Sequence, residues 1–294
     1  MKQLSSLIAD IIARLVLPPI KDGVIITTIF DFDLRINRDD GANYYYLGFY
    51  ELGTLDIFNK CLKEGDIFID IGASVGQMSL FASDLVGKSG KLFSFEQMKN
   101  RYSNLKKNLE INNRTNMEIF NMALGHKKEN MKFYDVGYYN PFLPPIFYYF
   151  FPNKRRYGMV GFNKDLNHFY VKVDRLDNIL EENKVNNVRL IKIDTEGFEP
   201  YVLLGAKKLL SQKDAPIICL EQGGSPVLDG EIIIDSFTLL REANQYRFFK
   251  LCQTKKFVSK LVEIDLDKYQ KNADNYFCFL PHHLDQLPKE AFKV

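Results

Sequence analysis

The chain has 294 residues, 46% hydrophobic and 26% charged, which is enough to bury one large core. Its formal net charge is only +2, so nucleic acid is not an expected partner, because such partners need many cations on one face. The four cysteines are scattered without a C-x-x-C pair. This spacing indicates neither a zinc site nor a disulfide framework, and it favours a reducing, cytoplasmic compartment.

Apolar residues recur at helical spacing within residues 4–16 and are followed by Pro18-Pro19, which predicts an amphipathic helix with a sharp end. Two charged residues interrupt the apolar run, so the pattern fits neither a secretory signal nor a membrane span. Packing against the domain or a partner chain is the main interpretation, and peripheral membrane contact is the alternative. Residues 24–40 are expected to add one or two strands, and residues 1–53 are assigned to an N-terminal extension.

From residue 54 onward, apolar runs alternate with amphipathic segments. Strands are expected at Ile67–Ile71, Lys91–Glu96, Met117–Met122, Leu190–Asp194 and Ile217–Glu221, and helices at Thr54–Leu62, Gly76–Val86, Asn100–Asn112, Pro200–Leu210 and Asp235–Asn244. This order predicts a mostly parallel sheet with helices on both faces. The segments FKLCQ and YFCFLP near the C-terminus are expected to pair as an antiparallel hairpin. Ligands of such sheets bind at the carboxyl ends of the strands.

The segment GDIFIDIGASVGQMSLFA (65–82) runs from a strand through a bend into a helix. Gly72 permits a sharp turn, and Gly76 lets the next helix begin close to a ligand. Glu96 ends the following strand, where an acid can accept both hydroxyls of a ribose. Because the bend is not G-x-G-x-x-G, a phosphate-free nucleoside such as S-adenosylmethionine is the expected ligand. The structural alternative is turn glycines beside an exposed acid at the end of a strand.

A second acidic group follows the strand in RLIKIDTEGFEPYVLLGAKKLL (189–210), where Asp194, Glu196 and Glu199 surround a glycine. Glu221 ends the next strand. Carboxylates at this edge can orient a hydroxyl, accept its proton or hold a divalent cation such as Mg²⁺. Capping of the following helix is the structural alternative.

Together these segments resemble the FkbM family of S-adenosylmethionine-dependent methyltransferases. The segments that carry the resemblance are YYLGFYE, GDIFIDIGASVGQMSLFA, GKLFSFE, NLKKNLEINN, NMALG, VDRLDNIL and LIKIDTEGFEPYVLLGA. The resemblance implies that residues 54–294 form a seven-stranded, Rossmann-like class I methyltransferase domain. It also implies O-methylation of a sugar, glycan, glycolipid or secondary-metabolite hydroxyl. The family usually has Asn where this chain has Ser74, and Pro where it has Gln97.

The resemblance carries roles onto individual residues. Those expected to bind the cofactor are Glu51, Asp70, Gly72, Ser74, Gly76, Glu96, Ala123 and Asp194. Glu96 would bind the ribose, Ala123 would border the adenine, and Tyr50 would lie near the cofactor or the substrate entrance. On the acceptor side, Asp194, Glu196 and Glu221 are the candidate catalytic residues. One of them would act as general base, or Asp194 and Glu221 would hold Mg²⁺.

Two other functions remain open. Residues 72–76 also spell G-x-S-x-G, the nucleophile motif of many serine hydrolases, and His282-His283 follow in the required chain order. A hydrolase gives Asp70 and Glu96 no role, so the methyltransferase interpretation is preferred. A non-catalytic relative that binds the cofactor as a partner module is the other alternative.

The least typical segment is the aromatic and proline-rich stretch within residues 137–162. Prolines prevent a regular helix, and exposed aromatic rings need a partner. The segment is interpreted as a lid over the acceptor, as a membrane contact anchored by Lys154, Arg155 and Arg156, or as packing on the domain or across a homodimer interface.

Overall fold

The computed structural model describes residues 22–37, 51–134, 159–160, 168–221, 227–228, 231–232, 235–252, 259–268 and 275–293. Three expectations lie outside these ranges: the N-terminal helix within residues 4–16, the position of Tyr50, and most of the aromatic segment 137–162, including Lys154, Arg155 and Arg156.

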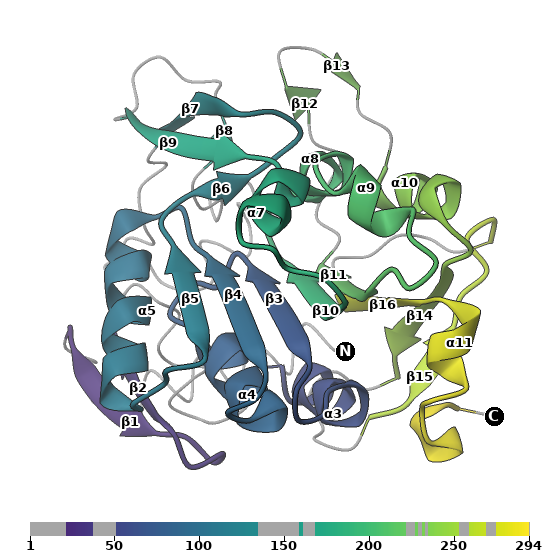
Figure 1. Ribbon diagram of the computed structural model, residues 1–294, viewed down its shortest axis with the longest axis horizontal. Coiled ribbons are helices and arrows are strands. Elements are labelled where there is room, and N and C mark those ends of the chain that lie inside the picture. Colours follow the sequence, from purple (N-terminus) through teal and green to yellow (C-terminus); the bar gives the residue numbers. More distant parts are fainter. Residues whose placement is uncertain are drawn as a thin grey trace, which may run out of the picture.

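An eight-stranded sheet forms the centre of the molecule (Figure 1). Its order is β15 (Leu261–Glu263), β14 (Arg247–Leu251), β16 (Asn275–Phe279), β11 (Ile217–Glu221), β10 (Val188–Ile193), β3 (Ile67–Ile71), β4 (Lys91–Phe95) and β5 (Met117–Phe120). The strands from β11 to β5 are parallel, and β16 is antiparallel to β11 and β14. The mostly parallel α/β sheet is confirmed, with β15 as an additional edge strand paired to β14.

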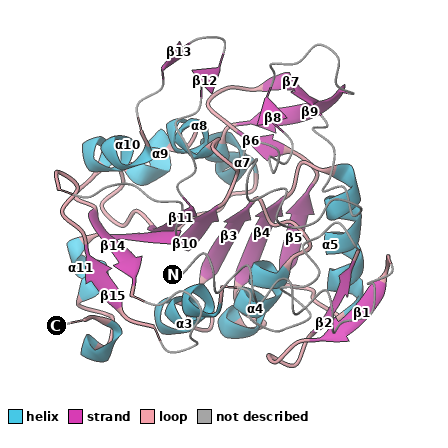
Figure 2. Cartoon of the chain, turned by 180° about the vertical axis from the view of Figure 1, so that it is seen from behind, coloured by secondary structure: helices cyan, strands magenta, loops and turns pink. Residues whose placement is uncertain are grey.

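Helices cover both faces of this sheet (Figures 1 and 2). One layer contains α3 (Leu52–Cys61), α4 (Gln77–Val86) and α5 (Lys99–Ile111), and the other contains α7 (Leu176–Glu182), α8 (Glu199–Leu204), α9 (Lys207–Leu210) and α10 (Ser236–Ala243). Side chains alternate along each strand between the two layers. Phe68 therefore packs in the cluster with α3 and α4, whereas Ile69 packs in the cluster with α7 and α8.

The helix expected at residues 200–210 is broken into α8 and α9. At Gly205 a Cβ atom would lie 2.0 Å from the backbone oxygen of Gly125. Because Gly205 has no Cβ atom, the loop at Gly125 can approach the backbone closely at this break. The chain continues to β12 (Val227–Leu228) and β13 (Glu231–Ile232), and it ends with α11 (Pro281–Leu284) and a 3₁₀ turn, Lys289–Ala291.

A small second sheet lies beyond the carboxyl ends of β3, β4 and β5 (Figure 1). Its order is β6 (Ala123–Leu124), β9 (His168–Asp174), β7 (Glu129–Tyr134) and β8 (Met159–Val160). The sequence pattern does not predict this sheet. Ala123 was expected at the end of the third strand, but β5 stops at Phe120 and Ala123 begins β6, which pairs with β9.

Before the main domain, β1 (Val24–Thr27) and β2 (Asp33–Ile36) form an antiparallel hairpin that packs against α5 (Figure 1). The sequence predicts one or two strands within residues 24–40, and the structure has two. The helices in the described ranges are all too short or too polar to cross a bilayer.

Candidate functional site

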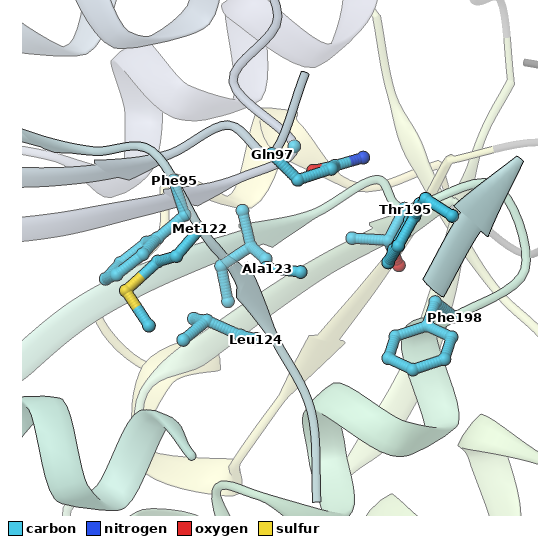
Figure 3. A pocket seen from close by; sticks show the side chains of 10 residues that line it. Phe95, Gln97, Met122, Ala123, Leu124, Thr195 and Phe198 are labelled. Carbon is cyan, nitrogen blue, oxygen red and sulfur yellow. The ribbon is translucent and has the colours of Figure 1, made fainter. Parts of the chain in front are cut away.

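A pocket lies at the carboxyl edge of the parallel strands, under the small sheet. It has about 300 Å³ of empty space, part of which is open to solvent. The residues that line it are Ile71, Gly72, Phe95, Gln97, Met122, Ala123, Leu124, Phe133, Thr195 and Phe198. Figure 3 shows Thr195 and Phe198 on one side and Phe95, Met122 and Leu124 on the other. The walls are mostly apolar, which suits a flat aromatic ring.

The bend after β3 borders this pocket and is held by Glu96. Glu96 Oε2 accepts a hydrogen bond from the Ser74 backbone N–H at 2.8 Å, and Oε1 accepts one from Met98 N–H at 2.7 Å. Burial raises the pKa of Glu96, and it is only 2% exposed. Each carboxylate oxygen can accept a further hydrogen bond. Ribose hydroxyls reach these oxygens only if the groups that cover them move.

The two glycines of the bend allow close approaches. A Cβ atom on Gly72 would lie 1.9 Å from the Asp194 backbone oxygen, and one on Gly76 would lie 2.4 Å from Leu105 Cδ1. Both glycines have positive φ angles, 85° and 94°. The bend therefore needs glycine for its conformation and for its contacts with β10 and α5.

Asp70 is buried directly below the bend. Its Oδ2 accepts a hydrogen bond from Ser79 Oγ at 2.5 Å, and Ser79 Oγ lies 2.9 Å from Ser94 Oγ. Within the described part of the chain, Asp70 Oδ1 has no hydrogen-bond partner. Burial raises the pKa of Asp70. A buried acceptor without a donor is costly, and a cationic ligand would relieve that cost.

Lys192, one residue before the end of β10, is surrounded by carboxyl groups. Its side chain is 4% exposed, and Nζ lies 2.8 Å from Asp194 Oδ2. Burial alone would lower the pKa of Lys192, but the charges of Asp194, Glu51 and Asp70 outweigh burial and hold the pKa well above its usual range. Lys192 is therefore a permanent cation at the tips of the strands.

Asp194 follows β10 directly, Glu221 ends the neighbouring β11, and the two carboxyls share a hydrogen bond. Burial alone would raise the pKa of Asp194, but the Lys192 ammonium and the bond with Glu221 hold it below its usual range. Burial, and then the adjacent Asp194 charge, raise the pKa of Glu221 to about 9. At neutral pH, Asp194 is the ionised member of the pair and Glu221 carries the proton.

Glu51 joins this cluster from the start of α3. Asn275 Nδ2, on β16, donates to Glu51 Oε2 at 2.8 Å and lies 3.1 Å from Thr54 Oγ1. Burial raises the pKa of Glu51, and the Lys192 ammonium opposes that shift. The structure thus gathers Glu51, Asp70, Asp194 and Glu221 around one lysine.

The acids after Asp194 have different roles. Glu199 Oε1 accepts hydrogen bonds from the Thr195 and Gly197 backbone N–H groups at 2.9 and 3.1 Å, so it holds the turn before α8. This is the structural role left open for that acid. Glu196 is exposed at the rim, where partial desolvation and the charge of Asp194 raise its pKa.

Three residues of the site have the left-handed backbone that side-chain-bearing residues rarely adopt. They are Glu51, Ser74 and Glu196, with φ angles of 48°, 52° and 56°. Each such residue costs on the order of 1 kcal/mol or more, and this strain concentrates at functional sites. All three lie next to the pocket edge or the acidic cluster.

The proposed Mg²⁺ ligands are bonded to other groups. Asp194 is paired with Lys192 and with Glu221, so a divalent cation there would have to displace an ammonium group. Across the described ranges, no three His, Cys, Asp or Glu side chains are arranged to hold a metal ion.

The histidines expected for a hydrolase lie far from Ser74. His282 and His283 follow β16, which is antiparallel to β11, so they lie at the amino edge of the parallel strands (Figure 1). His283 Nδ1 accepts a hydrogen bond from the Leu280 N–H at 3.2 Å, and burial lowers the pKa of His283 to about 3. These histidines therefore cannot activate Ser74.

Lys192 and Asn275 were not identified from the sequence. Lys192 carried a readable signal, because it is the one cation inside the buried part of β10, where an unpaired charge is too costly. Asn275 had no such signal, because its partner Glu51 is 224 residues away in the chain.

Residues 70–248, well over half of the chain, match the family model described as the methyltransferase FkbM domain. No relative is detected among curated proteins. Solved structures with a similar fold include an rRNA methylase from Streptococcus thermophilus (12% identity, 78% of this chain, 94% of that chain, TM-score 0.38). Another is a SAM-dependent methyltransferase from Aquifex aeolicus (12% identity, 78% of this chain, 88% of that chain, TM-score 0.36). A third is Aeropyrum pernix fibrillarin with bound S-adenosyl-L-methionine (12% identity, 76% of this chain, 72% of that chain, TM-score 0.39). Similarities this low indicate nothing about substrate.

The close approach at Gly72 predicts a large effect of a single methyl group. Gly72→Ala places Cβ against the Asp194 backbone and should lower the free energy of unfolding by about 3 kcal/mol or more. Gly65→Ala is the matched control, because Gly65 has φ 87° but its nearest contact is 3.8 Å away. It should cost only about 1 kcal/mol. Equal losses in urea unfolding would show that the approach to β10 does not matter.

The protonated Glu221 predicts a pH-dependent stability. Unfolded chains release this proton near the usual glutamate pKa of 4.5, whereas the folded chain keeps it to about pH 9. The free energy of unfolding therefore falls as pH rises through this window. Glu221→Gln keeps a donor for Asp194 and removes the titration. Between pH 5 and pH 8, the free energy of unfolding of the wild type should therefore fall by on the order of 1–3 kcal/mol more than that of Glu221→Gln.

Urea unfolding at pH 5, 6.5 and 8 measures this difference. Glu242→Gln, on the exposed surface of α10, should show the same change of unfolding free energy with pH as the wild type. The same change in Glu221→Gln would mean that Glu221 is ionised in the folded protein.

Proposed function

Because this chain belongs to the FkbM methyltransferase family, we propose that it transfers a methyl group from S-adenosyl-L-methionine to a hydroxyl of a sugar, glycan, glycolipid or secondary metabolite. The observation that carries the proposal is the pair formed by ionised Asp194 and protonated Glu221, at the same strand edge as the pocket. A hydroxyl needs a proton acceptor at this place, and the pair supplies one.

The residues fit the methyl donor at both ends. The apolar pocket beside Gln97 and Ala123 matches the adenine ring. Glu96 matches the ribose once the groups that cover its carboxylate move, since each oxygen can accept one more hydrogen bond. The unpartnered Asp70 Oδ1 and the surplus of carboxylates match a ligand with positive charge. When bound, S-adenosylmethionine supplies an electrophilic methyl group on a sulfonium.

The chain's own residues then have two tasks. The bend and the pocket hold the reacting groups in line, which is the larger part of catalysis for a displacement of this kind. Asp194 would accept the hydroxyl proton through a carboxylate oxygen as the oxygen–carbon bond forms and the sulfur–carbon bond of the donor breaks. Lys192 keeps Asp194 ionised before that step. Glu196, at the exposed rim, would contact the acceptor without taking its proton.

The family resemblance supports an acceptor that is a sugar, glycan, glycolipid or secondary metabolite. The composition supports the absence of a nucleic-acid partner and a cytoplasmic location. Homodimer formation and peripheral membrane contact are proposed for segments outside the described residues. The small net charge of +2 supports a neutral acceptor over RNA.

The donor site is tested by binding. Calorimetry with S-adenosylhomocysteine should give a Kd in the micromolar range, and Glu96→Ala should weaken it at least tenfold, because the ribose and the bend both lose acceptors. Glu118→Ala, an exposed acid on β5, should bind as the wild type does. Full affinity in Glu96→Ala would show that Glu96 does not bind the ribose. Absence of binding by the wild type would contradict the proposed function.

The transfer step is tested with a methyl-labelled donor and three acceptor pools: a glycolipid extract, oligosaccharides and total RNA. Label should enter the sugar-containing pools and should be unaffected by a metal chelator. Asp194→Asn should lower the rate about 100-fold or more, as expected for loss of a general base, and Glu196→Gln should lower it less than tenfold.

Three outcomes would contradict this assignment. Label in RNA alone would show that the acceptor is RNA and not a sugar-containing molecule. An unchanged rate in Asp194→Asn would show that Asp194 is not the general base. Donor binding without labelling of any pool would favour the non-catalytic relative.

A further inference from the structure

Helix α5 carries a ladder of asparagines that contacts the N-terminal hairpin. Asn108 Oδ1 accepts from the Arg35 N–H at 2.6 Å, and Asn108 Nδ2 donates to the Arg35 C=O at 3.0 Å. Asn112 repeats this pattern on Asp33, with distances of 2.8 and 2.6 Å. One turn earlier, Asn104 Oδ1 accepts from the Arg35 guanidinium. Each of the two later asparagines thus satisfies both backbone groups of one β2 residue.

The ladder replaces a neighbouring strand. Residues four apart on a helix rise about 6 Å, and residues two apart on a strand are separated by about 6.6–6.8 Å. The two repeats therefore match along the length of Asn108 to Asn112. Strand β1 occupies one edge of β2, and the asparagine amides occupy the other, so an exposed strand edge is closed by side chains.

Asn108 and Asn112 differ in the third contact of the side-chain amide. Asn112 Nδ2 also donates to the Asn108 backbone C=O at 2.7 Å, whereas Asn108 Nδ2 also donates to the Val75 backbone C=O at 2.8 Å, in the bend between Gly72 and Gly76. Asn108 and Val75 are both fully buried. With two bonds donated and one accepted, the Asn108 amide joins the hairpin and the bend through one rigid group.

The bend is therefore held from two sides. Glu96 binds the Ser74 N–H, and Asn108 binds the next carbonyl, that of Val75. Ser74 has a left-handed backbone, a conformation that persists only where surrounding contacts impose it. Removal of either contact leaves a buried polar group unsatisfied and lets the bend relax.

We propose that Asn108 is a positioning residue for the methyl-donor site, and that it couples docking of the hairpin at residues 22–37 to the conformation of the donor-binding bend. This inference rests on the proposed function, because it assigns the bend to the donor. The hairpin is then part of the donor site's support, although it contributes no residue to the pocket. By reciprocity, ligand binding at the bend also stabilises the docked hairpin.

Paired variants test the coupling. Asn108→Ala removes two hairpin contacts and the bend contact, whereas Asn112→Ala removes two hairpin contacts and the bond to the Asn108 carbonyl but no bend contact. In calorimetry with S-adenosylhomocysteine, Asn108→Ala should weaken binding about tenfold, the effect of one lost buried hydrogen bond. Asn112→Ala should change it less than twofold. Equal effects of the two variants on affinity would overturn the inference.

A second measurement uses the unmodified protein and does not depend on how well Asn108→Ala folds. Amide hydrogen exchange with and without saturating S-adenosylhomocysteine should show slower exchange at the Arg35 N–H, whose acceptor is Asn108. Unchanged exchange at Arg35, with measurable ligand binding, would overturn the coupling and leave the proposed function intact. Failure of the wild type to bind the ligand in calorimetry would instead overturn the proposed function.

Discussion

One buried ammonium group, that of Lys192, sets the charge balance at the carboxyl edge of the sheet. A lysine with 4% of its side chain exposed must be paired, because its desolvation is costly. Asp194 pairs with it directly, and Asp70 and Glu51 contribute further negative charge. The same cation keeps Asp194 ionised, whereas burial, and then the ionised Asp194, keep the proton on Glu221. The different protonation states of the two adjacent carboxyls thus follow from burial together with the position of one cation.

The backbone around this cluster is held in a conformation that it would not adopt alone. Ser74 and Glu196 have left-handed backbones on either side of the approach between Gly72 and Asp194. The contacts that maintain these conformations come from distant segments, with Glu96 on the Ser74 N–H and Asn108 on the Val75 carbonyl. A strained bend that many contacts hold is rigid, and rigidity in the donor site favours an aligned displacement.

The site has two chemically distinct parts. Phe95, Met122 and Phe198 make one part apolar, and the cluster around Lys192 makes the other acidic. A ligand with a flat ring at one end and a positive charge at the other satisfies both parts. The G-x-S-x-G letters have no such support, because the antiparallel course of β16 carries the two adjacent histidines to the other edge of the sheet. Residue identity favours the methyltransferase because it gives Asp70 and Glu96 a role, and strand direction then excludes these two histidines as partners of Ser74.

Local pattern alone determined much of this protein. Apolar periodicity placed the parallel strands to within a few residues, and the turn chemistry of Gly72 placed the bend after β3, because these features depend on near neighbours in the chain. The acids that end strands were also readable, since strand ends of parallel sheets share one edge. The tertiary structure alone decided which groups pair: Asp194 with Glu221, Asn275 with Glu51, and Asn108 with both Arg35 and Val75. Partners of buried charges and amides depend on strand order and register, which bring together residues that are far apart in the sequence.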